Sequence, residues 1–371
     1  MSINLRVAVD NQIFQRQSYG GISRYFAELE SNFTRIDEIS IKIFAPFHRN
    51  SYIHNSYNPR HVRFRLLNYT NRFGIGSSID RLSSRTARGQ ISKFDPHIIH
   101  ETFYSGKRDY LERIPRVITV YDMIRELEDP TSEKAKRKFS SIMAATSIIT
   151  ISESTRIDLL NLLPVDPRNV KTIHLAASDF FSLVGGNAVN SMRPYVLYVG
   201  QRSGYKNFLN FCKSFALCSS LRKDFDIHVF GGGPLDNLES QILREIGLTK
   251  NVVKIDGDDL QLRNQYMNAR ALVYPSIMEG FGIPLVEAMM SGCPVICSDR
   301  SSIPEIAGGA ANYFDPTSIE SMASVLESTL NDSEILKTMR ENGLARSKNF
   351  SWMRTVEETR LVYRDTIQRA L

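Results

Sequence analysis

The sequence predicts an α/β protein with two doubly wound domains, each built around a mostly parallel sheet. Short apolar, β-branched runs alternate with amphipathic runs along most of the chain, which is typical of parallel strands joined by helices. A length of 371 residues suits two or three domains. Periodicity is lost between residues 176 and 194, where Gly185 and Gly186 are adjacent. We therefore expect a first domain over residues 1–178, a linker over 179–194, a second domain over 195–352 and a last helix over 353–371.

The composition is that of an ordinary globular protein without stabilising cross-links. Apolar residues make up 42% of the chain and charged residues 23%. None of the cysteines has zinc-site or CxxC spacing, so we expect core residues of a protein in a reducing compartment. No apolar run approaches the roughly 20 residues of a membrane-spanning helix, and the N-terminus has no signal-peptide pattern. These features predict a cytoplasmic protein. The cysteines are Cys212, Cys218, Cys293 and Cys297.

Positive charge is concentrated in the first half of the chain. Residues 41–140 contain 19 Lys and Arg against 10 Asp and Glu. Arg81, Arg85, Arg88 and Lys93 recur at near-helical spacing in a stretch without acidic residues. Such a face either is solvated or docks on anionic lipid headgroups, at about 1 kcal/mol per charge. The second alternative predicts peripheral contact through residues 81–93 with the inner face of the cytoplasmic membrane. We expect no nucleic-acid partner, because no aromatic stacking platform accompanies the charge.

The first domain opens with a strand pattern at residues 5–10, followed by a loop and a helix that starts near Gly20 and Gly21. Paired glycines at a strand–helix junction let a phosphate approach the unpaired N–H groups of the helix start. Further strand patterns follow, with helical patterns between many of them. They cover residues 39–45, 62–67, 97–100, 116–121, 147–152 and 169–175.

Polar residues stand at the carboxyl ends of two of these strands. In doubly wound sheets ligands bind just beyond those ends, which makes His100, Tyr121 and Asp122 candidate contacts for a bound ligand, an acceptor or a sugar in the family to which the chain is compared below. His100 has the chemistry to orient or deprotonate a hydroxyl group, and the alternative is a structural hydrogen bond. Tyr121 would donate a hydrogen bond and Asp122 would accept one.

The second domain begins with a strand pattern at residues 195–200, a loop and a helix expected over 208–219. The loop contains Arg202 and Lys206, whose cations could neutralise an anionic ligand such as a diphosphate. The alternative for each is an exposed loop charge. Residues 256–258 read Asp-Gly-Asp, a spacing that can bind a divalent cation beside a diphosphate. We nevertheless expect no metal, because Arg202, Lys206 and the helix start at Pro284 would already neutralise the phosphate charge.

The most informative stretch runs from a strand pattern at residues 271–274 through a glycine loop into a helix expected over 285–290. Pro284 is pre-organised for the start of that helix. Strand, glycine loop and helix start make an anion site without a basic side chain. Glu279 and Glu287 flank this site, and carboxylates suit the paired hydroxyls of a ribose or a hexose. For Glu287 the alternative is helix stabilisation, worth about 0.3–1 kcal/mol.

The run from Glu279, E-G-F-G-I-P-L-V-E-A-M-x-x-G-x-P-V-I, resembles the signature of retaining glycosyltransferases of family 4, which have the GT-B fold. The resemblance extends over essentially the whole chain and is sharp from residue 197 onward. It implies two Rossmann-like domains that face each other across a cleft. The nucleotide-sugar donor would lie mainly on the second domain and the acceptor mainly on the first.

The resemblance also implies roles for single residues. Glu279 would meet the donor sugar, and with Arg202 and Lys206 it forms the implied catalytic set. The family usually has Arg directly before the lysine, where this chain has Tyr205, so we expect Arg202 to supply the guanidinium. The family often has His-Asp where this chain has Tyr121-Asp122, which excludes a histidine base there. The implied donor-binding residues are Gly20 and Gly21 at the pyrophosphate, Gly280, Phe281, Gly282 and Ile283 through the backbone, and Glu287 at the ribose.

These features predict a retaining, metal-independent hexosyltransferase that needs no cofactor. It would move mannose or a related hexose from a GDP- or UDP-linked donor to a saccharide or lipid-linked saccharide during surface-polysaccharide or lipopolysaccharide synthesis. Front-side attack is expected, because no side chain presents itself as a covalent nucleophile. Two alternatives stay open: a nucleotide-sugar 2-epimerase of the same architecture, and a non-catalytic nucleotide-binding subunit of a polysaccharide assembly complex.

Overall fold

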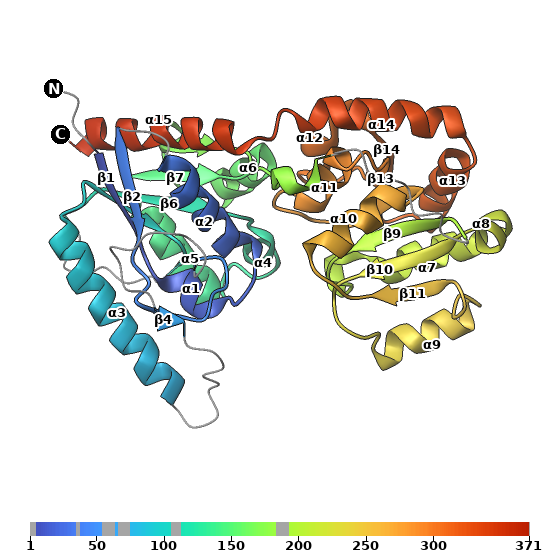
Figure 1. Cartoon of the computed structure of the whole chain (residues 1–371), viewed down its shortest axis with the longest axis horizontal. Helices are drawn as coiled ribbons and strands as arrows, with labels where there is room; N and C mark the ends of the chain where they lie inside the picture. The colour runs from blue at the N-terminus through green and yellow to red at the C-terminus, as the bar shows by residue number, and fades with distance from the viewer. Residues whose placement is uncertain are drawn as a thin grey trace. The chain divides into compact units, whose positions relative to one another are not determined.

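The chain forms two compact units in the computed structural model, each with its own sheet (Figure 1). The structure describes residues 5–34, 38–53, 64–65, 75–104, 113–182 and 193–370, with only the backbone at 64–65 and 75–77. Unit 1 comprises Met1–Leu175 and Trp352–Leu371, and unit 2 comprises Ala176–Ser351. Most of the predicted linker, residues 183–192, lies outside the described residues, and residues 179–182 belong to unit 2.

The sheet of unit 1 has six parallel strands in the order β2-β1-β5-β6-β7-β8. β2 lies on one side of β1, and β5 lies on its other side. The strand order therefore reverses between β1 and β5, and this switch point is where such sheets bind ligands. The strands are β1 Leu5–Val9, β2 Ile39–Ile43, β5 Ile98–Glu101, β6 Arg116–Val120, β7 Ser147–Thr150 and β8 Val170–Thr172.

Helices cover the sheet of unit 1 because its strands are almost fully buried. Ile118, Ile142 and Leu159 belong to one apolar cluster, and Ala8, Ala87 and Ile91 belong to a second cluster beneath α3. A two-stranded ribbon, β3 Phe47–His48 with β4 Phe64–Arg65, lies apart from the main sheet. The helices are α1 Gln12–Arg16, α2 Gly21–Phe33, α3 Ile75–Phe94, α4 Ile124–Glu128, α5 Glu133–Met143, α6 Glu153–Leu162 and α15 Trp352–Ala370.

The sheet of unit 2 is also parallel throughout, in the order β11-β10-β9-β12-β13-β14. Its strand order reverses between β9 and β12, so its switch point lies between the loops that follow these two strands. The strands are β9 Tyr195–Val199, β10 Asp226–Phe230, β11 Val252–Ile255, β12 Ala271–Tyr274, β13 Val295–Ser298 and β14 Ala311–Phe314. The helices are α7 Phe208–Leu217, α8 Ser219–Asp224, α9 Asn237–Glu245, α10 Asp259–Asn268, α11 Ile283–Met290, α12 Ile303–Ala307, α13 Ile319–Leu330 and α14 Ser333–Ser347.

The predicted fold class of two doubly wound parallel sheets is confirmed, with local differences. The helix expected over 208–219 is interrupted at Cys218, whose extended backbone ends α7 and begins α8. The strand expected over 62–67 is described only at Phe64–Arg65. All four cysteines are buried, as their apolar surroundings predict. Among the described residues, no helix is long and apolar enough to cross a membrane.

Candidate functional site

Two loops lie side by side at the switch point of unit 2 because β9 and β12 are neighbouring strands. The first, residues 200–207, turns at Gly200, whose φ of +119° is unfavourable for residues with a side chain. The second, residues 275–282, is joined to the first by the N–H of Ile277, which donates to the carbonyl oxygen of Tyr205 at 2.8 Å. The topology thus brings together Lys206 and Glu279, which lie far apart in the sequence.

Lys206 and Glu279 form an ion pair at the centre of this site. Nζ of Lys206 lies 2.6 Å from Oε1 of Glu279, and the hydroxyl of Tyr274 donates to the same oxygen at 2.6 Å. Burial, and then the Glu279 carboxylate, raise the pKa of Tyr274 well above its ordinary value, so this hydroxyl stays a donor. The Lys206 side chain is 22% exposed and that of Glu279 is 10% exposed. The ammonium group is therefore held in place yet accessible to an anionic ligand.

Asn207 sets the position of Lys206, a role that sequence reasoning missed. Its backbone is left-handed, with φ of +59°, a conformation that asparagine tolerates better than most residues. Its buried side-chain amide donates to the carbonyl oxygens of Pro275 at 3.1 Å and Pro316 at 2.8 Å. Lys206 is thus fixed at the end of a short turn, directly before α7. The signal in the sequence was the Lys-Asn pair itself.

Two serines, also missed, anchor the loop that carries Glu279. The hydroxyl of Ser301 donates to the carbonyl oxygen of Glu279 at 2.7 Å and accepts its N–H at 3.2 Å. The hydroxyl of Ser302 lies 3.0 Å from the same carbonyl oxygen and 3.1 Å from that of Phe281. These contacts tie the loop to the start of α12 and so orient the Glu279 carboxylate.

The glycine loop ends at Gly282, which begins α11 in a left-handed conformation with φ of +95°. A Cβ atom at this position would lie 2.9 Å from Cδ1 of Leu285, so both strain and space favour glycine. The Phe281 side chain points into the core, where it packs edge-on against Phe350 with ring centroids 5.8 Å apart. The side chain of Phe281 is therefore unavailable to a ligand in this structure, and the backbone contact stays a prediction. Helix starts leave backbone N–H groups without intrahelical partners.

Glu287 lies in the second turn of α11, so the helix-start interpretation of this carboxylate is weak. Its side chain is buried, and Oε2 accepts a hydrogen bond from the hydroxyl of Tyr266 at 3.2 Å. Burial raises the pKa of Tyr266 well above its ordinary value, and the Glu287 carboxylate adds to the shift. Glu287 is thus a buried hydrogen-bond acceptor one turn behind the glycine loop.

The structure places Arg202 in a buried network of hydrogen bonds. Its side chain is 5% exposed, and its five N–H groups are all bonded. Two reach the Glu239 carboxylate at 2.7 and 3.1 Å, and the other three reach the carbonyl oxygens of Gly231, Gly233 and Pro234 at 2.7–3.2 Å. In this structure Arg202 therefore holds the loop after β10 and presents no unbonded N–H group, and its catalytic role stays a prediction.

The structure places His100 in the core of unit 1. The side chain is fully buried, with Nδ1 2.7 Å from the hydroxyl of Tyr363 on α15 and Nε2 2.8 Å from the hydroxyl of Thr119. Burial lowers the pKa of His100 to about 3, so the ring is neutral at physiological pH. Both ring nitrogens are thus engaged in the core, the arrangement that the structural alternative describes, and contact with an acceptor stays a prediction.

Tyr121 and Asp122 follow β6 but differ in accessibility. Tyr121 is 8% exposed and packs edge-on against Tyr25 with centroids 6.0 Å apart, so it is a core residue here. The Asp122 side chain is 42% exposed. Its Oδ1 accepts the N–H of Ile124 at 3.3 Å and lies 3.7 Å from Nζ of Lys138. Asp122 is therefore the accessible residue of the pair, and its contact with an acceptor stays a prediction.

The glycine pair of unit 1 begins α2, as its position in the sequence predicts. Gly20 caps the helix, and its carbonyl oxygen accepts hydrogen bonds from the N–H of Arg24 and the hydroxyl of Ser23, both at 3.0 Å. Gly21, the first helical residue, is exposed. The predicted contact of this pair with a pyrophosphate is not tested by the geometry.

The Asp-Gly-Asp sequence has local structural functions. The Asp258 side chain caps α10 by accepting the N–H of Gln261 at 3.0 Å, and the Gln261 side chain bonds the N–H of Asp258 in return. Asp256 pairs with Lys254 at 2.5 Å. Each carboxylate is thus used within the loop around α10.

Two family models match the chain, one after the other. A Glycosyltransferase Family 4 model matches residues 19–177, and a Glycosyl transferases group 1 model matches residues 183–346. The O-antigen chain mannosyltransferase B of Escherichia coli is 27% identical over 282 residues, which span 70% of this chain and 74% of that protein. The serotype-specific mannosyltransferase WbdA of Escherichia coli is 25% identical over 71% of this chain, but the match spans only 36% of the relative's own length.

A solved structure with a similar fold is that of HepE from Anabaena in complex with UDP and glucose. It superposes with a TM-score of 0.76 at 14% identity, covering 97% of this chain and all of that one. Both family models are glycosyltransferase models, and each falls largely within one of the two parallel-sheet units. The chain therefore belongs to the glycosyltransferases with the GT-B fold.

Proposed function

We propose that this glycosyltransferase is a retaining, metal-independent hexosyltransferase of surface-polysaccharide or lipopolysaccharide synthesis. It transfers mannose or a related hexose from a GDP- or UDP-linked donor to a saccharide or lipid-linked saccharide, without a cofactor. The mannosyltransferase names of the relatives in Escherichia coli support the sugar and the type of product. The UDP bound in the HepE structure supports a nucleoside diphosphate as the leaving group.

The observation that carries this proposal is the Lys206–Glu279 pair next to the start of α11. The donor diphosphate would lie against the Lys206 ammonium and the first N–H groups of α11, which together stabilise the charge that develops as the glycosidic bond breaks. Glu279 would accept hydrogen bonds from the hydroxyls of the transferred sugar. Glu287 would accept hydrogen bonds from the ribose.

Retention would follow from front-side attack. The Glu279 oxygen nearest to Lys206 already accepts two hydrogen bonds, which suits an orienting role better than nucleophilic attack. In the proposed step the acceptor hydroxyl attacks the anomeric carbon on the face that the phosphate leaves, and the departing phosphate oxygen takes the hydroxyl proton. The new bond therefore has the configuration of the old one.

The proposal is tested by incubating the full chain with GDP-mannose, UDP-glucose and other nucleotide sugars, with and without lipid-linked oligosaccharide acceptors. We expect nucleoside diphosphate release that increases with acceptor, an α-linked product from an α-linked donor, and the same rate in EDTA. An inverted anomeric configuration in the product's NMR spectrum would reject retention, and loss of activity in EDTA would reject metal independence.

The same incubations separate the two alternatives. A 2-epimerase would convert the nucleotide sugar into its epimer without any acceptor. A non-catalytic subunit would bind nucleotide but release none from the donors. No observation in the structure favours either alternative over transfer.

The place of action is proposed to be the cytoplasm, with peripheral contact between residues 81–93 and the inner face of the membrane. On α3, Arg81, Leu82, Arg85 and Lys93 are all exposed, which supports such a contact. Flotation with phosphatidylglycerol vesicles tests it, since Arg81→Gln/Arg85→Gln should then float less than the wild-type chain.

A further inference from the structure

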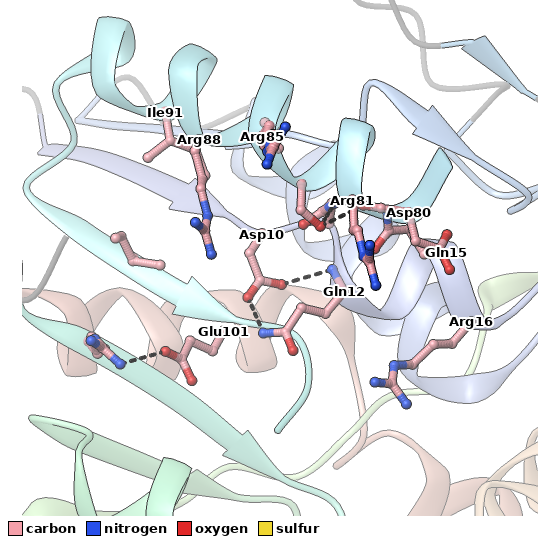
Figure 2. Close-up of a pocket in the computed structure, with 15 residues that line it drawn as sticks. Asp10, Gln12, Gln15, Arg16, Asp80, Arg81, Arg85, Arg88, Ile91 and Glu101 are labelled. Carbon is pink, nitrogen blue, oxygen red and sulfur yellow. Dashed lines mark hydrogen bonds and ion pairs between the residues drawn. The ribbon is translucent and has the colours of Figure 1, made fainter. Parts of the chain in front are cut away.

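Unit 1 contains a cavity of about 420 Å³, and its lining includes Arg81 and Arg85, the residues that the flotation test above changes. It is located at the switch point of the unit 1 sheet, between α1, α3 and the ends of β1 and β5 (Figure 2). Ala87, Ile91 and Ile99 form its apolar wall. Small-molecule sites have volumes of roughly 300–1,000 Å³, and doubly wound sheets bind ligands at the switch point. Size and position therefore mark a ligand site.

Two carboxyl groups at the ends of β1 and β5 line the cavity. Asp10 accepts N–H groups of Gln12 at 3.2 Å and Thr102 at 3.1 Å, and the Gln12 side chain donates to it at 2.6 Å. Glu101 pairs with Arg116 at 3.0 Å. Burial raises the pKa of Asp10 above its ordinary value and, with Asp10 nearby, that of Glu101 to about 7. Fixed carboxyl groups of this kind bond the hydroxyls of a sugar.

Arginines dominate the remaining polar lining. Figure 2 shows Arg81 and Arg88 projecting from α3 toward the side where Asp10 and Glu101 lie. Within the described part of the chain, neither Arg81 nor Arg85 has an ion-pair or hydrogen-bond partner. The charged residues that line the cavity are five arginines, Arg16, Arg81, Arg85, Arg88 and Arg116, and three acidic residues, Asp10, Asp80 and Glu101.

We infer that this cavity binds the acceptor, and that the acceptor is a saccharide carrying an anionic group. The group, a phosphate or a carboxylate, pairs with the guanidinium groups of Arg81 and Arg85, while Asp10 and Glu101 bond the sugar hydroxyls. Two unpaired guanidinium groups at the edge of a cavity match such an anion through charge and paired N–H donors. The inference rests on the proposed function, because it names the class of substrate that receives the sugar.

The cavity shape favours a small anionic ligand over a membrane surface. A membrane surface would contact cations on an exposed face, whereas Arg81 and Arg88 project from α3 toward the side where the carboxyl groups of Asp10 and Glu101 lie (Figure 2). A neutral sugar would bond those carboxyl groups but leave Arg81 and Arg85 without a counter-charge. An anionic sugar satisfies both.

The test is a ligand-observed NMR titration of the full chain with three probes: α-D-glucose 1-phosphate, D-glucuronate and methyl α-D-glucopyranoside. We expect at least one anionic probe to bind tenfold or more tightly than the neutral glycoside, and the better of the two identifies phosphate or carboxylate. Arg81→Gln/Arg85→Gln should weaken that binding tenfold or more, and added salt should weaken it in the wild-type chain.

Two controls locate the effect. Lys134→Gln/Arg137→Gln removes the same charge from the exposed face of α5 and should leave binding unchanged. Lys206→Ala alters the donor site in unit 2 and should also leave it unchanged, which excludes binding of the sugar phosphate there.

Equal binding of the neutral glycoside, or unchanged binding in Arg81→Gln/Arg85→Gln, would overturn the inference. The inference would also fail if Arg81→Gln/Arg85→Gln no longer floated with vesicles but still bound the sugar phosphate, because the arginines would then contact a membrane. Failure of the proposed function looks different, because it would show as absent nucleotide-sugar turnover in the wild-type chain.

Discussion

Replacing Arg202 by methionine tests whether this residue is structural or catalytic. Arg202 and Glu239 are 5% and 8% exposed, and two hydrogen bonds of 2.7 and 3.1 Å join them. The other three N–H groups hold the carbonyl oxygens of the glycine-rich loop after β10. We therefore expect Arg202→Met to lower the stability of unit 2.

The magnitude follows from what the substitution leaves behind. Without Arg202, the buried carboxylate of Glu239 has no cation, which costs about 3–5 kcal/mol. For a unit of this size each kcal/mol lowers the melting temperature by about 2–4 °C, so we expect a decrease on the order of 10 °C. Arg202→Met/Glu239→Met removes the uncompensated charge and should be more stable than Arg202→Met.

The assay combines thermal unfolding with turnover measured well below the melting temperature. Arg354→Met is the matched control, because its pair with Glu358 is exposed and contributes at most about 0.5 kcal/mol. If Arg202→Met melts like the wild-type chain yet loses turnover, the structural argument is wrong. Arg202 would then have to leave Glu239 and contact the diphosphate.

Three further predictions concern other residues. Lys206→Ala should lower kcat about 100-fold or more, because one electrostatic donor is lost. Nucleotide affinity measured by calorimetry should change little. An unchanged kcat would remove Lys206 from the mechanism. Glu287→Ala should weaken nucleoside diphosphate binding roughly tenfold, the value of a hydrogen bond to a charged group, and undiminished affinity would refute the ribose contact. Burial raises the pKa of Glu101 from 4.5 to about 7, so its stabilising contribution is complete below pH 4.5 and lost as pH rises through 7. Glu101→Gln should therefore flatten the fall in unfolding free energy between pH 4.5 and 7 by about 3 kcal/mol, and an identical pH profile would contradict this.

The parts of the fold that could be predicted were those with a local signal. The runs at β9 and β12 are apolar and end in glycine or proline, so both strands and the loops after them are evident from the sequence. The pairing of Lys206 with Glu279 follows from the same signals, because neighbouring parallel strands end at the same edge. The break at Cys218 was missed, since its neighbours on both sides are helical and no glycine or proline marks it.

The contacts that could not be predicted are those of polar residues whose partners are distant in the sequence. His100 lies at a strand end, the expected place for a ligand contact. Its Nδ1, however, bonds the hydroxyl of Tyr363 on α15, which is 263 residues away in the sequence. Arg202 lies in the loop after β9, next to Lys206, but its side chain bonds the carboxylate of Glu239, which is 37 residues away in the sequence. Ser301 and Ser302 anchor Glu279 from more than 20 residues away, and no pattern around them indicates it.

The sequence by itself determined the parallel-sheet class, the family and the two loops of the donor site, because periodicity, turn residues and a long motif are properties of neighbouring residues. Only the tertiary structure decided which charged side chains bond other groups of the protein and which stay accessible to a ligand. Arg202 and His100 are fully bonded, Lys206 is held but partly exposed, and Arg81 and Arg85 line a cavity. The physical reason is that the cost of burying a polar group depends on partners that only folding brings within hydrogen-bond distance.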